Sequence, residues 1–200
     1  VSIKVGDGVT GDAGDLSITS GKTTASGSGG QVTITSGSST PTSSGDIIMT
    51  TAKAGSSGVS GMIHLSTGAS TDGRSGAVMI TTGQGVQDAS GDILLAVGSG
   101  DTGAGGDVVV TAGETTADNV AGGKVTVTSG TGDLSGDVTM KSGTATNGVS
   151  GAMTFASGGS TGVSGALSIK SGDASGANSG SVTVESGAST GSGRGGDVSI

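Results

Sequence analysis

Gly30-Gln31-Val32-Thr33-Ile34-Thr35-Ser36-Gly37 is one copy of a motif that recurs along the whole chain. The motif consists of an opening glycine, a polar residue, an apolar residue, any residue, a second apolar residue, any residue, a small residue and a closing glycine. Gly136–Gly143 and Gly180–Gly187 are further copies. A fixed period in the tens of residues is typical of repeat proteins, in which each unit buries its apolar face only against its neighbours.

The opening glycine returns after about fifteen residues, with a residue or two of variation that fits fixed motifs joined by variable loops. The opening glycines are Gly14, Gly30, Gly45, Gly61, Gly76, Gly91, Gly106, Gly123, Gly136, Gly151, Gly165, Gly180 and Gly196. The two apolar positions of every motif alternate with period two, which places both side chains on one face of a β-strand. A helix is disfavoured because no apolar set recurs at spacings of three and four.

These features predict an all-β fold, namely a β-solenoid (β-helix) of about 13–14 coils with roughly 15 residues per coil. Because such a coil is short, we expect a flattened, two-sided cross-section with glycines at the corners supplying positive φ angles. The apolar pairs would point into a thin core, together with the small residue before each closing glycine. We expect one continuous array over residues 1–200.

Composition offers a simpler alternative, a disordered glycine/serine linker. The chain has 45 Gly, one Phe, one Pro and neither Trp nor Tyr among its 200 residues, and such a composition is typical of linkers. A linker has no reason to keep two apolar residues in phase through every repeat, so the periodicity favours the ordered array.

The net charge and the two ends of the chain indicate which partners and which location to expect. The net charge is −8 with only 12% charged residues, so neither nucleic acid nor an anionic membrane is an expected partner. Cysteine is absent, and richness in Ser, Thr, Gly and Asp favours an extracellular or cell-surface location. The chain opens on Val1-Ser2-Ile3 and closes on Val198-Ser199-Ile200, the same phase of the repeat. We therefore expect an excerpt of a longer repetitive protein, or one unit of a fibre.

Few residues suggest chemistry. His64 is the only histidine and occupies an outward position, so neither a catalytic nor a metal-binding role is expected. Aspartates follow several opening glycines and could form part of a calcium site or, as we prefer, accept hydrogen bonds from nearby backbone N–H groups in turns. They are Asp15, Asp46, Asp92, Asp107, Asp137 and Asp197. Catalytic triads, phosphate-binding loops and dinucleotide-binding fingerprints are absent from the sequence, so we expect no enzymatic activity and no cofactor.

Outward positions offer two candidate surfaces. Thr33/Thr35 and Thr126/Thr128 form Thr-x-Thr pairs that resemble the ice-binding ladders of β-solenoid antifreeze proteins. Elsewhere, large apolar residues occupy the middle of the motif, where other copies have Thr or Ser. In the predicted solenoid these residues would form a stripe that packs against another polypeptide. The stripe consists of Ile48, Met79, Leu94 and Val109.

The stretches Ser135–Gly143 and Ser164–Gly172 resemble the Gly/Ser/Thr-rich repeats of large secreted β-solenoid proteins, such as bacterial adhesins, surface filaments and algal flagellar hairs. The resemblance covers the whole chain and implies a shaft or spacer with no site of its own. We therefore expect a structural protein that forms a stiff extracellular rod, filament or stalk; the alternative is an ice- or surface-binding module. Expected partners are further copies joined end to end and a lateral partner on the stripe.

Overall fold

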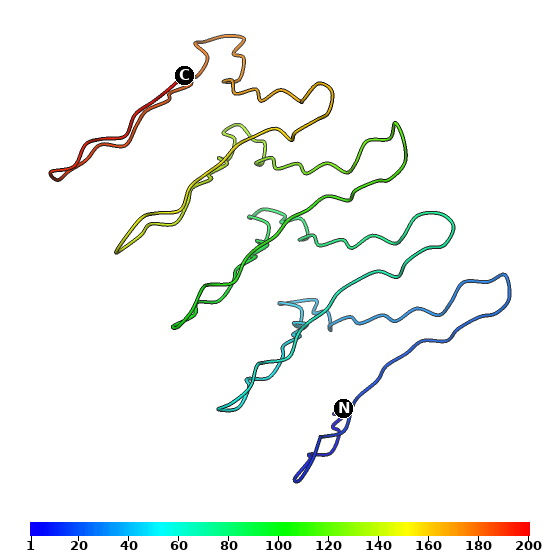
Figure 1. Cartoon of the computed structure of the whole chain (residues 1–200). Helices are drawn as coiled ribbons and strands as arrows, with labels where there is room; N and C mark the ends of the chain where they lie inside the picture. The colour runs from blue at the N-terminus through cyan, green and yellow to red at the C-terminus, as the bar shows by residue number, and fades with distance from the viewer. The chain divides into compact units, whose positions relative to one another are not determined.

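The computed structural model describes all residues from Val1 to Ile200 and contains neither a helix nor a strand. The ribbon in Figure 1 accordingly shows only irregular chain with long, narrow excursions. The predicted all-β solenoid, with its stacked coils and flattened core, is therefore wrong. The sequence repeat corresponds to a regular series of bent loops and not to the strands of a sheet.

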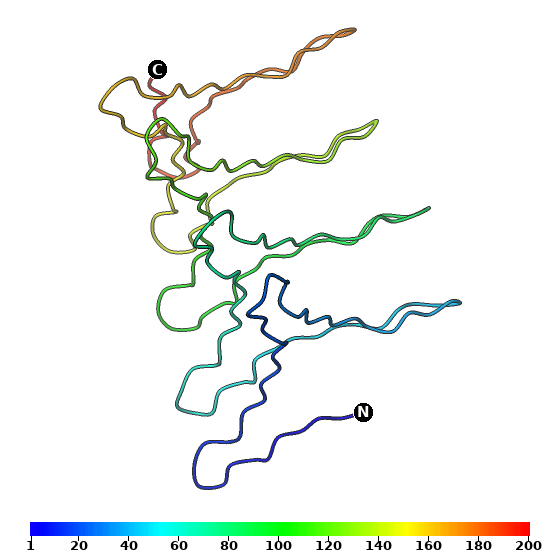
Figure 2. The same ribbon diagram turned by 90° about the vertical axis from the view of Figure 1, so that its right-hand side faces the viewer.

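Each repeat contains one straight part and one bend. The motifs run without a bend or turn, and the stretch from one closing glycine to the next opening glycine, here called the connecting loop, changes direction once. The bends occupy residues 9–11, 24–27, 40–42, 56–58, 71–73, 86–88, 101–103, 117–119, 132–134, 146–148, 161–162, 175–177 and 190–193. The period of the sequence is thus a period of loops, which Figure 2 shows from a second side.

The chain divides into two units, Val1–Ala96 and Val97–Ile200. The division falls inside the motif Gly91–Gly98, so the repeat itself continues through it. Both units are built from the same alternation of straight motifs and bent loops, and the following description applies to each unit separately.

Single backbone hydrogen bonds close six of the connecting loops. In each case the N–H of an opening glycine donates to the carbonyl of the closing glycine before it. The bonds are Gly14 to Gly6 at 3.5 Å, Gly30 to Gly21 and Gly45 to Gly37 at 2.9 Å, Gly123 to Gly113 at 2.8 Å, and Gly136 to Gly130 and Gly196 to Gly187 at 3.1 Å. The next positions along the two legs form no such bond, so pairing stops after one step and no ladder develops.

Close approach of the two legs accounts for glycine at four opening positions, Gly14, Gly30, Gly106 and Gly123, where an added methyl group would lie 2.6–3.0 Å from the nearest atom. At the other opening positions the methyl group would meet ordinary van der Waals contacts, with the small residue before the preceding closing glycine within 4.0 Å, or open space at Gly165. The methyl would be 2.6 Å from Val5 Cγ1 at Gly14 and 3.0 Å from Val97 Cγ1 at Gly106. The partners of the remaining opening glycines are Ser20, Ser36, Thr51, Thr67, Thr82, Ala112, Ser129, Ser142, Ser171 and Ser186.

The small residue before the closing glycine, here called the penultimate residue, is also where the chain comes closest to burial. Only eight residues are partly buried, and six of them are penultimate residues. They are Val5, Ser20, Ser36, Ala112, Ser129 and Ser171. Two hydroxyls at this position reinforce loop closure: Ser20 Oγ donates to the Gly30 carbonyl at 2.9 Å and Thr67 Oγ1 to the Gly76 carbonyl at 3.2 Å.

No apolar side chain is buried. The first apolar position of the motifs is 45–64% exposed and the second 56–78%, apart from the chain ends. The expectation of a core formed by these residues, Ile93 and Val125 among them, is therefore wrong. Two aliphatic side chains per repeat, among glycine, serine and threonine, supply too little apolar area to offset the entropy of ordering the whole unit.

The glycines that need a left-handed backbone are different from those expected at the corners. Positive φ angles occur at Gly58, Gly73, Gly103 and Gly148, each of which ends a bend three residues before an opening glycine. The opening and closing glycines have no such angle. Two further loops adopt positive φ without glycine, at Gln87 (67°) and Asn119 (58°). Glycine thus serves two purposes here, a left-handed bend in the loop and close contact at its base.

Candidate interaction surface

The four residues of the expected stripe are among the most exposed of the internal apolar side chains. Ile48, Met79, Leu94 and Val109 are 77–85% exposed, more than the apolar neighbours on either side of them. Because no sheet is present, nothing aligns the four into one stripe, and each stands on its own motif. Their role as an interface with another polypeptide stays a prediction.

The Thr-x-Thr pairs likewise lie outside any sheet. Thr33, Thr35, Thr126 and Thr128 are exposed and lie on unbonded stretches of chain. An ice-binding face requires a flat and regular array over many neighbouring rungs, and the rungs would have to be strands of one sheet. The structure provides no such sheet.

Acidic side chains stand apart from one another. None of the six aspartates that follow opening glycines forms a hydrogen bond or an ion pair, and no cluster of three or more His, Cys, Asp or Glu residues is close enough to hold a metal ion. His64 is exposed and has no hydrogen-bond partner. The single ion pair joins Lys4 Nζ to Asp7 Oδ2 at 3.2 Å, with both side chains exposed, and a pair of this kind adds little stability.

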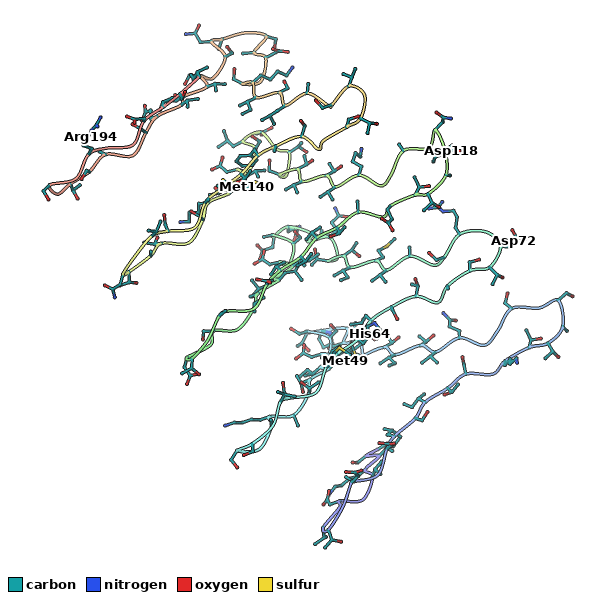
Figure 3. The ribbon with its side chains drawn as sticks, viewed as in Figure 1. Met49, His64, Asp72, Asp118, Met140 and Arg194 are labelled. Carbon is teal, nitrogen blue, oxygen red and sulfur yellow. The ribbon has the colours of Figure 1, made fainter.

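Polar side chains in the loops bond locally to their own bends. Ser39 and Thr42 share a hydroxyl–hydroxyl bond of 2.9 Å, and the Thr42 N–H donates to Ser39 Oγ at 3.2 Å. Ser70 Oγ donates to the Asp72 carbonyl at 2.9 Å. Asp72 and Asp118 lie at the outer ends of their loops in Figure 3. These bonds are those expected of Ser and Thr in turns, and they shape the bend without creating a binding site.

No pocket is present on the molecule. Helices are lacking altogether, so there is none with the length and apolarity to cross a lipid bilayer. In comparisons with protein-family models, with curated proteins and with solved structures, no match was found. The physical features available for a functional assignment are therefore the repeated loop, the exposed apolar motif and the low charge.

Sequence reasoning did not identify the loop base. The contact between an opening glycine and the penultimate residue joins positions about nine residues apart, with the loop between them. One sequence feature could have indicated this contact. Each motif ends on a small residue followed by a closing glycine, and the next motif begins with an opening glycine. The prediction that these residues form the corners and core of a stacked coil is wrong, because the chain has no sheet.

Proposed function

We propose that the chain is a structural segment of an extracellular filament or stalk. The observation that supports the proposal most directly is the uniformity of the repeat: every connecting loop bends once, and nearly every opening glycine returns close to the penultimate residue of the preceding motif. A chain that repeats one local arrangement and carries neither a pocket nor a cluster of titratable groups is suited to spanning distance. Stiffness is not part of the proposal, because it depended on the stacked sheet.

The extracellular setting is supported by composition alone. Serine, threonine, glycine and aspartate dominate the loops, and cysteine is absent. A chain with few charged residues and a net charge of −8 does not attract polyanions. No specific observation favours the ice-binding alternative, since neither Thr-x-Thr pair lies on a strand.

The proposal can be tested by linking one, two and three copies of the chain in tandem. A structural spacer should give particles whose end-to-end length increases in step with copy number, measured by atomic force microscopy or electron microscopy of dilute samples. A control of equal length, in which the 200 residues are shuffled at constant composition, should give a smaller and irregular increase. Tandem copies that collapse into compact particles would refute the proposed function.

A further inference from the structure

The surface of this chain is far larger than that of a folded monomer of the same mass. The accessible area is 19482 Å² for 18.2 kDa. A folded monomer of that mass exposes about 8,100 Å². The excess of about 11,000 Å² is several times the ~1,600 Å² that an ordinary protein–protein interface buries. A single small globular partner would cover only a fraction of it.

The backbone is equally unpartnered. Six backbone–backbone hydrogen bonds serve 200 residues, and all six lie at loop bases. Folded proteins form about one internal hydrogen bond per residue, two-thirds of them between backbone groups. The straight motifs therefore present free N–H and C=O groups beside alternating apolar side chains, which is the combination that recruits another extended chain by strand addition. A partner with an apolar segment about every fifteen residues would match it, and the chain itself has that period.

One motif adds complementary charge. Gly136–Gly143 is the only motif with acidic and basic residues together, Asp137 at its second position and Lys141 at its sixth. If two copies of this motif lie antiparallel about Thr139, Asp137 of each is opposite Lys141 of the other, and Val138 is opposite Met140. Val138 and Met140 are 51% and 56% exposed and free to make this contact; Met140 is labelled in Figure 3.

We infer that the exposed motifs bind a second copy of the same chain, and that the two copies of Gly136–Gly143 pair antiparallel about Thr139 with Asp137 opposite Lys141. The pairing is between chains, not between successive repeats of one chain. The inference rests on the proposed function, since it names the partner from which a filament would be built. Opposite charges directly across such a pair stabilise it and like charges destabilise it.

Sedimentation equilibrium at low salt over a concentration series tests the pairing. Asp137→Lys alone brings like charges together twice in the symmetric pair and should raise the dissociation constant about fivefold. The combined Asp137→Lys and Lys141→Asp variant should return the dissociation constant to the wild-type value. A second comparison uses two double variants. The motif variant replaces Val138 and Met140 by Ser, and the loop variant replaces Leu134 and Val149 of the neighbouring loops, which are 94% and 97% exposed, by Ser. The motif variant should weaken association at least about tenfold and the loop variant much less.

Three outcomes would overturn the inference: a wild-type chain that stays monomeric to millimolar concentration, a double charge variant that fails to restore association, or a loop variant as disruptive as the motif variant. These outcomes are distinct from failure of the proposed function. Monomeric chains whose tandem length still increases with copy number would leave the structural function standing. Chains that associate as expected but whose tandem length does not increase would leave the pairing standing and refute the function.

Discussion

At the scale of single residues, glycine defines this molecule through two separate requirements. One is space: at Gly14, Gly30, Gly106 and Gly123 an added methyl group would come within 3.0 Å of a penultimate side chain or of the backbone beside it. The other is backbone conformation: the glycine that ends several bends has a positive φ. Each requirement can be tested by adding a single methyl group, because alanine changes both space and accessible φ angles while adding little else.

Gly123→Ala should open the loop Gly113–Gly123. The added methyl would lie 3.0 Å from the Gly113 nitrogen and 3.3 Å from Ala112 Cβ, and backbone atoms cannot move aside as a side-chain end can. We expect a cost of about 1–3 kcal/mol for loop closure, seen as lost protection of the residue 123 amide in NMR hydrogen exchange. Gly45→Ala is the control, since its loop has a similar bond of 2.9 Å but its methyl meets nothing closer than 3.8 Å.

Gly148→Ala tests the second requirement. Gly148 has a φ of 114° and open space around it, so any effect comes from the backbone. We expect the native bend to lose about 1–3 kcal/mol, measured by chemical shifts and NOEs of residues 146–148. Gly143→Ala, which has equal space and no positive φ, should leave that bend unchanged. Equal effects at the two positions would show that φ is not the cause.

At the scale of the element, the repeating unit is a straight motif followed by a connecting loop. The sequence predicts part of this arrangement. The division of each repeat into a motif and a connecting loop could be predicted from residues such as Gly30, Val32, Ile34 and Gly37, but the prediction that each motif is a β-strand of a solenoid was wrong. The sheet could not be predicted correctly from the sequence. Alternation shows which side chains share a face, but it does not show whether a neighbouring strand is available to pair with. Exposure of Val32 and Ile34 shows that the alternation found no partner within the chain.

Ser20→Ala should weaken closure of the loop Gly21–Gly30 without abolishing it. The substitution removes the 2.9 Å bond from Ser20 Oγ to the Gly30 carbonyl and leaves the backbone bond from the Gly30 N–H to the Gly21 carbonyl. A net loss of about 0.5–1.5 kcal/mol is expected. The temperature coefficient of the Gly30 amide proton reports it. Ser17→Ala, at an exposed residue without a hydrogen bond, should leave the coefficient unaltered.

At the scale of the whole molecule, the absence of a buried core determines the thermodynamics. Neither unit contains a buried apolar or polar side chain, so the dilute chain has no cooperative structure to lose. The candidate interface residues Ile48, Met79, Leu94 and Val109 could be identified from the sequence as unusual for their positions. Their alignment into a stripe could not be identified from the sequence, because the stripe was deduced from the predicted solenoid and the solenoid is wrong.

Calorimetry of the dilute chain should therefore show no unfolding peak and only a small heat-capacity change, since no apolar side chain is buried and unfolding would expose little further apolar surface. Far-UV circular dichroism should change gradually with temperature and without a midpoint. A cooperative transition that is independent of concentration would contradict the exposure of the motifs. A transition that appears only as concentration rises would instead report association between chains.

The single hydrogen bond at the base of a loop has a mechanical meaning. While the base of a loop is closed, the residues of that loop add almost nothing to the end-to-end length of the chain. A nine-residue loop such as Gly37–Gly45 stores about 30 Å of contour, and only one backbone bond and one small packing contact retain it. A filament made of such segments would lengthen under load in many small, reversible steps, releasing stored length and dissipating work long before its covalent backbone was strained.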